Sequence, residues 1–399
     1  MRIKYVSHFG PEGQFVAAKR LMLALAESGV ELTWTPMVLG DRWGLHVEPF
    51  RGRSVGDPDL DEFCNRPLAA DTVIVHLRPV FYPRWAELEP GKRLVGHTVW
   101  ETDRLPPQWP ALLARATDVI VPCCWNRDVF VRSGVRVPVH VVPHVAAPRP
   151  ERAGGRSPAT ARGADPFVFY SIGTWTVRKA IPLLLRCYLK TFTGRDPVRL
   201  VLKTTESAHA NVWYGRSRAL RLLRAAARRL ARTRSTAPPP SARAAVERIL
   251  RRHPDPPEVL LVTGTLPDTG IDEIHRQGDC FVSLTHGEGW GIPAFDAATR
   301  GTPVIMTGYG GQMEYLDAER AGIVGYDLVP VREDNDPDTF RREQRWAMPR
   351  LAEAATLMRS VVARPDEWRE RAGGIRERIL AAYEGKRVAA HLLAALGKG

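Results

Sequence analysis

Two acidic residues flank a glycine-rich turn in the C-terminal half of the chain. Residues 286–296 read HGEGWGIPAFD, so seven residues separate Glu288 from Asp296. Pro293 predicts that a helix begins here, because proline loses no hydrogen bond in the first turn of a helix. Free amide hydrogens at a helix start bind phosphate, and glycines let the backbone approach a ligand closely. The spacing suits one acid for the hydroxyls of a sugar and one for those of a ribose, with a diphosphate between them.

Three basic residues follow strands that we expect in the same half of the chain. Arg178 and Lys179 come shortly after an expected strand at 167–172, and Lys203 lies near the end of another at 198–204. They would bring positive charge to the carboxyl ends of strands, where ligands bind in doubly wound folds. For Arg178 and Lys203, a plain solvated charge is an equal alternative.

The N-terminal half offers a histidine and two acids. His97 ends an expected strand at 93–98. A lone histidine is more often structural than catalytic, but its place at the carboxyl end of a strand favours a role in a site. Glu101 and Asp103 follow it, and they either meet the hydroxyl of an acceptor or form hydrogen bonds within their own loop.

Strands alternate with helices along most of the chain, which implies parallel sheets with right-handed crossovers. A loop that contains Gly10 and Gly13 leads into a helix expected at 14–28, and residues 146–166, rich in Pro, Gly, Ala and Arg, predict a linker. Strands are expected at 2–7, 31–38, 72–77, 93–98, 118–122 and 137–142 before the linker, and at 167–172, 198–204, 258–263, 280–284 and 303–306 after it.

The expected fold class is therefore α/β, with two doubly wound, Rossmann-like domains that face a central cleft. The tail from about Trp346 has a helical pattern with few breakers before Gly373. The expected units are an N-terminal domain at 1–150, a C-terminal domain at 167–380 with an insertion at 206–257, and a C-terminal helix at 381–399 that packs back toward the first domain.

The segment 286–296 resembles the donor-binding segment of retaining GT-B glycosyltransferases of family 4, the glycosyl transferases group 1, whose pattern is two acids with seven residues between them. The family usually has glutamate at both ends, and here Asp296 is one methylene shorter. Residues 310–314, GGQME, match the GGxxE element that usually follows in this family. His97 and Thr98 are similar to its HT element, whose histidine reaches the sugar and phosphate.

The resemblance implies a reaction and a set of site residues. The protein would move a sugar from a nucleoside-diphosphate sugar to a hydroxyl-bearing small molecule or glycan, with retention of anomeric configuration and with no metal or other cofactor. The base (UDP, GDP or another), the sugar and the acceptor stay open. The implied catalytic residues are His97 and Glu288; the implied donor-binding residues are Gly10, Gly13, Arg178, Lys179, Lys203, Gly289, Trp290, Gly291 and Asp296; the acceptor candidates are Glu101 and Asp103.

The sequence departs from the family pattern at the diphosphate-binding element. Lys179 matches the lysine that neutralises leaving-group charge, but Thr174 stands where the family has arginine and Ala180 where it has glycine. Arg178 or Lys203 would then replace the missing cation. No DxD cluster lies beside an expected strand end, and the five cysteines fit no paired metal-ligand spacing.

The positive charge of the chain is concentrated in one segment. Residues 211–253 hold twelve arginines and one acid, which give +11 of the net +13. Helical spacing places leucines on one face and arginines on the other, as in a solvated helix packed on its domain or in a peripheral membrane contact through 211–234. We expect no nucleic-acid partner.

Two classes of alternative function stay open. A sugar-nucleotide epimerase or a glycosyl phosphorylase uses the same architecture, and the arginine-rich segment would suit a basic membrane-docking module. No stretch reaches the roughly 18 apolar residues of a membrane-spanning helix, so we expect a cytoplasmic protein, with membrane association as the alternative.

Overall fold

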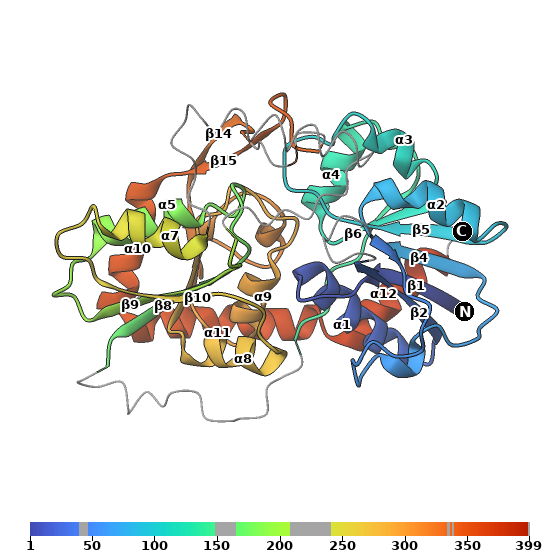
Figure 1. The fold of residues 1–399 in the computed structure, drawn as a ribbon, viewed down its shortest axis with the longest axis horizontal. Coiled ribbons are helices and arrows are strands. Elements are labelled where there is room, and N and C mark those ends of the chain that lie inside the picture. Colours follow the sequence, from blue (N-terminus) through green and yellow to red (C-terminus); the bar gives the residue numbers. More distant parts are fainter. Residues whose placement is uncertain (40–46, 148–164, 208–240, 333–335, 337–338, 398–399) are drawn as a thin grey trace.

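Two mainly parallel sheets, each covered by helices on both faces, form the centres of two lobes (Figure 1). The structure is a computed structural model that describes residues 1–39, 47–147, 165–207, 241–332, 336 and 339–397. The α/β class and the two Rossmann-like lobes expected from the sequence are confirmed. The arginine-rich segment 211–234 lies outside the described residues.

The described sheet of the N-terminal lobe has the order β3-β2-β1-β4-β5-β6-β7, and its neighbours are parallel except β2 and β3. Alternate residues point to opposite faces: Tyr5 and Ile74 pack with α1 and α12, whereas Val6 and Val75 pack on the other face. The strands are β1 Arg2–His8, β2 Glu31–Leu39, β3 Val47–Pro49, β4 Thr72–His76, β5 Arg93–His97, β6 Asp118–Val121 and β7 Val139–Val141; the helices are α1 Gly13–Glu27, α2 Tyr82–Leu88, α3 Trp109–Leu113 and α4 Cys124–Arg132.

The described sheet of the C-terminal lobe has the order β10-β9-β8-β11-β12-β13, with all neighbours parallel. Helices α5, α7 and α10 cover one face, and α9 and α11 cover the other. The strands are β8 Phe167–Ile172, β9 Val198–Lys203, β10 Glu258–Val262, β11 Cys280–Ser283, β12 Val304–Thr307 and β13 Gly322–Val324; the helices are α5 Ile181–Thr191, α7 Ala242–Leu250, α8 Asp268–Gln277, α9 Ile292–Thr299, α10 Leu351–Ala363 and α11 Pro365–Ala382.

The first strand of each lobe lies at a switch point of its sheet. β1 is flanked by β2 and β4, and β8 by β9 and β11. Ligands bind outside the carboxyl ends of strands at such points, because the connections there leave in opposite directions. The loop after β1 leads to Gly13, and the loop after β8 carries Lys179.

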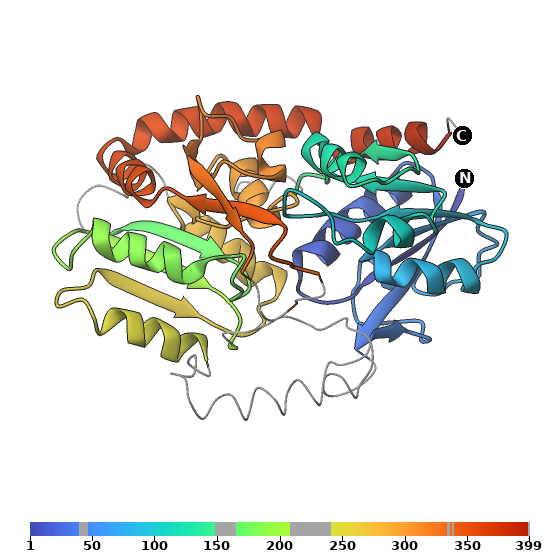
Figure 2. The ribbon, with the colours of Figure 1, turned by 90° about the horizontal axis from the view of Figure 1, so that it is seen from above.

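The chain returns to the N-terminal lobe at its C-terminal end. Figure 2 shows α11 along the C-terminal lobe and α12 (Gly385–Gly397) beside the N-terminal one. In α12, Val388, Leu392 and Leu396 are buried in the same core cluster as Tyr5 and residues of α1. None of the described helices is long and apolar enough to cross a membrane.

The expectation of a helical tail from Trp346 is wrong for its first residues. Arg345–Pro349 form β15, which pairs antiparallel with β14 (Tyr326–Pro330), and the first tail helix begins at Leu351. Backbone pairing with β14 and burial of Trp346 outweigh the local helical pattern. Gly373 and Gly374 also do not end a helix, since α11 runs through both.

The β14–β15 hairpin belongs to the C-terminal lobe by sequence but docks on the N-terminal lobe. In the connection between its strands, Phe340 stacks on Trp100 with ring centroids 5.2 Å apart. At the start of β15, the backbone of Arg345 exchanges hydrogen bonds with Asp103. The hairpin therefore ties the two lobes together.

Candidate donor-binding site

Two sequence motifs join through their backbones next to α9. Glu288 and Gly310 form an isolated parallel bridge, and the Gly311 amide donates to the Glu288 carbonyl at 2.8 Å. A Cβ on Gly311 would lie 1.9 Å from the carbonyl oxygen of Gly289, so only glycine allows this approach. The GGxxE element thus supports the turn that carries Glu288.

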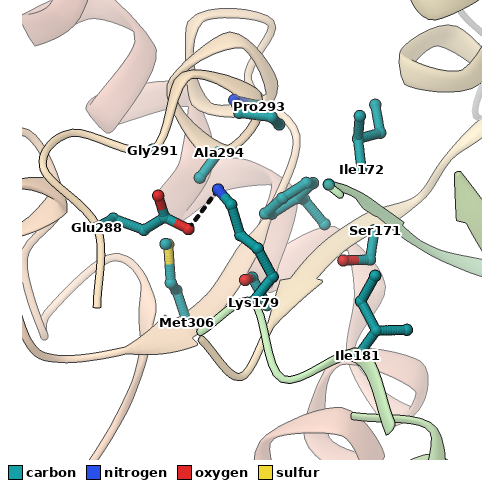
Figure 3. Close-up of a pocket in the computed structure, with 12 residues that line it drawn as sticks. Ser171, Ile172, Lys179, Ile181, Glu288, Gly291, Pro293, Ala294 and Met306 are labelled. Carbon is teal, nitrogen blue, oxygen red and sulfur yellow. Dashed lines mark hydrogen bonds and ion pairs between the residues drawn. The ribbon is translucent and has the colours of Figure 1, made fainter. Parts of the chain in front are cut away.

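The Glu288 carboxylate is held by two cations from the loop after β8. Lys179 Nζ donates to its Oε1 at 2.7 Å, and Arg178 NH1 donates to its Oε2 at 3.2 Å. Figure 3 shows the Lys179 side chain reaching across to Glu288. Burial raises the pKa of Glu288, but the two cations outweigh burial and hold that pKa below its ordinary value. Glu288 is therefore ionised at neutral pH.

The ion pair of Lys179 and Glu288 lies in a pocket at the start of α9. The helix is preceded by Gly291, whose φ of 86° falls in the left-handed region that favours glycine. The pocket is small, with a cavity volume of about 10 Å³. Its other lining residues include Ser171, Gly173, Ser283, Pro293 and Ala294 (Figure 3). Amide hydrogens of a helix start and a lysine in one pocket suit a phosphate group.

Lys179 is buried beside its acid. Burial lowers the pKa of Lys179, while Glu288 opposes that shift. An anion entering the pocket would offer Lys179 a second acceptor. The arrangement can therefore exchange an internal ion pair for a contact with a phosphate.

Asp296 faces the N-terminal lobe. Arg20 of α1 donates to both of its carboxylate oxygens, at 2.6 and 2.8 Å, and both side chains are largely buried. Burial raises the pKa of Asp296, but Arg20 outweighs burial and keeps it below its ordinary value. In this structure the acid expected to contact a ribose is a partner in an ion pair between the lobes.

His97 is one of several buried histidines at the carboxyl ends of the N-terminal strands. Its side chain is 1% exposed, and its ring stacks on that of His76 with centroids 3.8 Å apart. Burial, with a smaller contribution from His144, lowers the pKa of His97 well below its ordinary value, so the ring is neutral. Among the described residues, Nε2 of His97 has no hydrogen-bond partner.

The two acceptor candidates contact the C-terminal lobe. Glu101 Oε1 lies 3.5 Å from Arg178 NH2. Asp103 accepts a hydrogen bond from the Arg345 amide at 2.6 Å, and its own amide donates to the Arg345 carbonyl at 3.0 Å. Asp103 therefore fastens the β14–β15 hairpin, whereas Glu101 lies next to the cations of the pocket.

The remaining predicted residues are spread around the pocket. Lys203 donates to the carbonyl of Gly264 at 2.7 Å and does not line the pocket. A Cβ on Gly13 would touch Ile292 at 3.5 Å, whereas one on Gly10 would meet no described atom within 4 Å. A Cβ on Gly289 would collide with Val99 of the other lobe at 2.6 Å.

Trp290 is part of the core beneath the pocket. It is 2% exposed and packs against Phe295, Tyr315 and Tyr383. Of the predicted site residues, the structure gathers the catalytic candidate Glu288 and the donor-binding candidates Lys179 and Gly291 in the pocket, with Arg178 beside them. Among the described residues, no group of three or more His, Cys, Asp or Glu side chains could hold a metal ion.

Residues 254–327 match the family model described as Glycosyl transferases group 1. The resemblance seen in the sequence is confirmed over this segment. The matched residues contain Glu288, Asp296 and the GGxxE element, so the family signature coincides with the pocket. No curated protein matches the sequence significantly.

Solved structures of similar fold extend the likeness to the whole chain. HepE from Anabaena, in complex with UDP and glucose, is 11% identical, covers 100% of both chains and has a TM-score of 0.62. Sucrose-phosphate synthase from Thermosynechococcus elongatus is 14% identical over 100% of this chain and 98% of its own, with a TM-score of 0.64. The trehalose-6-phosphate structure from E. coli, with UDP-2-fluoro glucose, is 14% identical over 100% and 99%, with a TM-score of 0.59. The fold is GT-B.

Sequence reasoning missed three residues that shape this glycosyltransferase-like site. Arg20, Tyr5 and His76 belong to no motif: Arg20 pairs with Asp296, whereas Tyr5 and His76 contact His97. An arginine in an amphipathic helix and a tyrosine in a buried strand carry no signal of a site. Only the docking of the elements shows their partners.

Proposed function

We propose that the protein is a glycosyltransferase that moves a sugar from a nucleoside-diphosphate sugar to a hydroxyl acceptor with retention of anomeric configuration. The proposed donor is a UDP-sugar, since structures of the same fold are described with UDP, UDP-glucose or UDP-2-fluoro glucose. No metal or other cofactor is proposed, because the chain's own cations carry the charge of the diphosphate.

One observation supports this proposal most strongly. Lys179 and Glu288 meet at the amino end of α9, in a turn supported by the GGxxE element. A lysine and free amides stabilise negative charge on a leaving diphosphate, and a carboxylate beside them accepts hydrogen bonds from sugar hydroxyls. The site therefore offers a cation and free amides to a diphosphate and a carboxylate to the hydroxyls of a sugar.

In the proposed reaction, the bond between the anomeric carbon and the β-phosphate oxygen breaks, while the acceptor oxygen bonds to the same carbon. Attack comes from the face that the diphosphate leaves, without a covalent enzyme intermediate. The acceptor hydroxyl gives its proton to the departing phosphate oxygen. Lys179 and the α9 amides stabilise the diphosphate as its charge develops.

The two lobes would divide the substrates between them. His97 would contact the sugar from the N-terminal lobe through Nε2, and Glu101 would face the acceptor next to Arg178. Arg178 would supply the second cation, which the sequence lacks at Thr174. Asp296 would contact the ribose if the donor displaces Arg20 from it.

The test begins with a panel of nucleotide sugars in a thermal-shift assay. A donor at about 100 times its Kd stabilises the folded protein by about 2.7 kcal/mol. The donor that stabilises most is then used with candidate acceptors to measure turnover. We expect Glu288→Gln to lower turnover by about 10² to 10³-fold and Thr174→Ala, the matched control in the loop after β8, to change it little.

Three results would overturn the proposal. They are near-wild-type turnover of Glu288→Gln, absence of a shift with every nucleotide sugar, and formation of an epimer from the donor without an acceptor. The last result would identify an epimerase on the same fold.

A further inference from the structure

A stack of imidazoles lies at the carboxyl ends of β4 and β5. His76 and His97 are register partners in the sheet, and their rings are nearly parallel, at 12° with centroids 3.8 Å apart. His144 lies beside them, with centroids 6.2 Å from His76 and 5.9 Å from His97. All three side chains are buried, and burial lowers the pKa of each. The rings are neutral, so each carries one ring proton and has a definite tautomer.

Tyr5 on the neighbouring strand β1 contacts two of these rings. Its hydroxyl oxygen lies 2.8 Å from Nδ1 of His76 and 3.5 Å from Nδ1 of His97. Tyr5 is fully buried, and burial raises its pKa well above its ordinary value, so the hydroxyl keeps its proton. A phenol has one hydrogen to donate. The two Nδ1 atoms are the partners of this hydroxyl among the described residues, so it donates to one of them, and where both contacts are hydrogen bonds it accepts from the other.

This bonding requires opposite tautomers in the two histidines. If Tyr5 donates to His76, then His97 carries its proton on Nδ1 and leaves Nε2 as a bare acceptor. If Tyr5 donates to His97, then Nε2 of His97 carries an N–H group. Nε2 of His97 has no partner among the described residues, and a buried N–H without a partner is rarer than a buried acceptor without one. The first arrangement is therefore favoured.

We propose that Tyr5 and His76 are positioning residues that fix His97 with its proton on Nδ1, so that its bare Nε2 accepts a hydrogen bond from a hydroxyl of the donor sugar. The inference rests on the proposed function for the identity of the ligand. The tautomer itself is inferred from the contacts of Tyr5 and from the unpartnered Nε2 of His97. In this role Tyr5 and His76 act through His97 and need no contact with the ligand.

The tautomers can be measured directly in the full chain. Protein labelled with ¹⁵N in histidine gives separate shifts for protonated and bare ring nitrogens, and His76→Asn and His97→Asn assign the signals. We expect a bare Nε2 in His97 and a bare Nδ1 in His76 without any added ligand. The same tautomer in both rings, or a protonated Nε2 in His97, would overturn the inference whatever the activity is.

The second measurement is the variant Tyr5→Phe, which keeps the ring and removes the hydroxyl. Turnover is measured with the donor found by thermal shift. We expect kcat to fall about tenfold, because the variant loses one buried hydrogen bond that holds His97 in place. In a His97→Ala background the same change should have no further effect, because Tyr5 acts through His97. An equal loss in both backgrounds would show a merely structural role.

The matched control is Tyr188→Phe, a buried tyrosine of α5 whose hydroxyl donates to the carbonyl of Glu258 at 3.1 Å. It should leave kcat and the histidine signals unchanged. If no nucleotide sugar supports transfer, the proposed function fails, while the ¹⁵N shifts still test the tautomers. If Tyr5→Phe does not fold, the shifts of the unmodified protein decide the inference.

Discussion

The ion pair between Arg20 and Asp296 gives a quantitative prediction. It joins α1 of one lobe to α9 of the other through two hydrogen bonds, at 2.6 and 2.8 Å, and the exposed fractions of the side chains are 16% and 9%. Arg20→Met keeps most of the side-chain length and removes the charge. Asp296 is then left buried as an uncompensated carboxylate.

Removing one partner of a buried ion pair costs about 3–5 kcal/mol. We expect about 3 kcal/mol for Arg20→Met, the lower end of that range, because Arg300 also favours the charged form of Asp296. Asp296→Asn should cost a similar amount, since it leaves Arg20 buried without its acid. The double variant should cost less than the sum of the two, because neither buried charge remains.

The assay is equilibrium unfolding in urea, which keeps the ionic strength low. The natural protein, the two single variants and the double variant form a double-mutant cycle and are compared at one pH. A matched control is Arg127→Met, which breaks an exposed pair with Asp128 and should change stability by less than about 1 kcal/mol. The reasoning is refuted if Arg20→Met behaves like this control, or if the effects of the two single variants simply add.

The same pair has a predictable dependence on pH. The pKa of Asp296 is lower in the folded protein than in the unfolded chain. The contribution of the ion pair to the free energy of unfolding is therefore fully present above the unfolded pKa of about 3.9, and it is lost as the pH falls through the folded pKa. The difference in stability between the natural protein and Asp296→Asn should therefore be constant from about pH 5 to 8 and shrink below about pH 4.

Two further predictions concern the site and the arginine-rich segment. Gly311→Ala places a Cβ 1.9 Å from the Gly289 carbonyl oxygen and should lower the free energy of unfolding by about 1–3 kcal/mol. The control in thermal denaturation is Gly10→Ala, whose Cβ meets no described atom within 4 Å. Equal melting temperatures of the two variants would contradict the close approach at Gly311. Deleting residues 211–234 should leave the thermal shift by the donor unchanged if this segment only docks on a surface, and loss of the shift would mean that the donor site lies elsewhere.

The sequence by itself predicted the repeated strand-helix pattern, the glycine turn before α9 and the place of Lys179 after the strand β8. These features depend on local rules: strands and helices have fixed periods, and a turn or a helix start needs glycine or proline at set positions. The start of β15 shows the limit of such rules. Its residues have a helical pattern, but pairing with β14 makes them a strand.

The tertiary structure decided which side chains the site residues meet. Asp296 pairs with a residue 276 positions away, and His97 shares the hydroxyl of Tyr5, 92 positions away. Trp290, in the middle of the motif, packs into the core. No spacing in the chain encodes these contacts, because they arise only when the two lobes dock and when β1 and β5 take their places on either side of β4. Local geometry follows from the order of residues, whereas the partner of a buried charge or imidazole follows from the packing of distant elements.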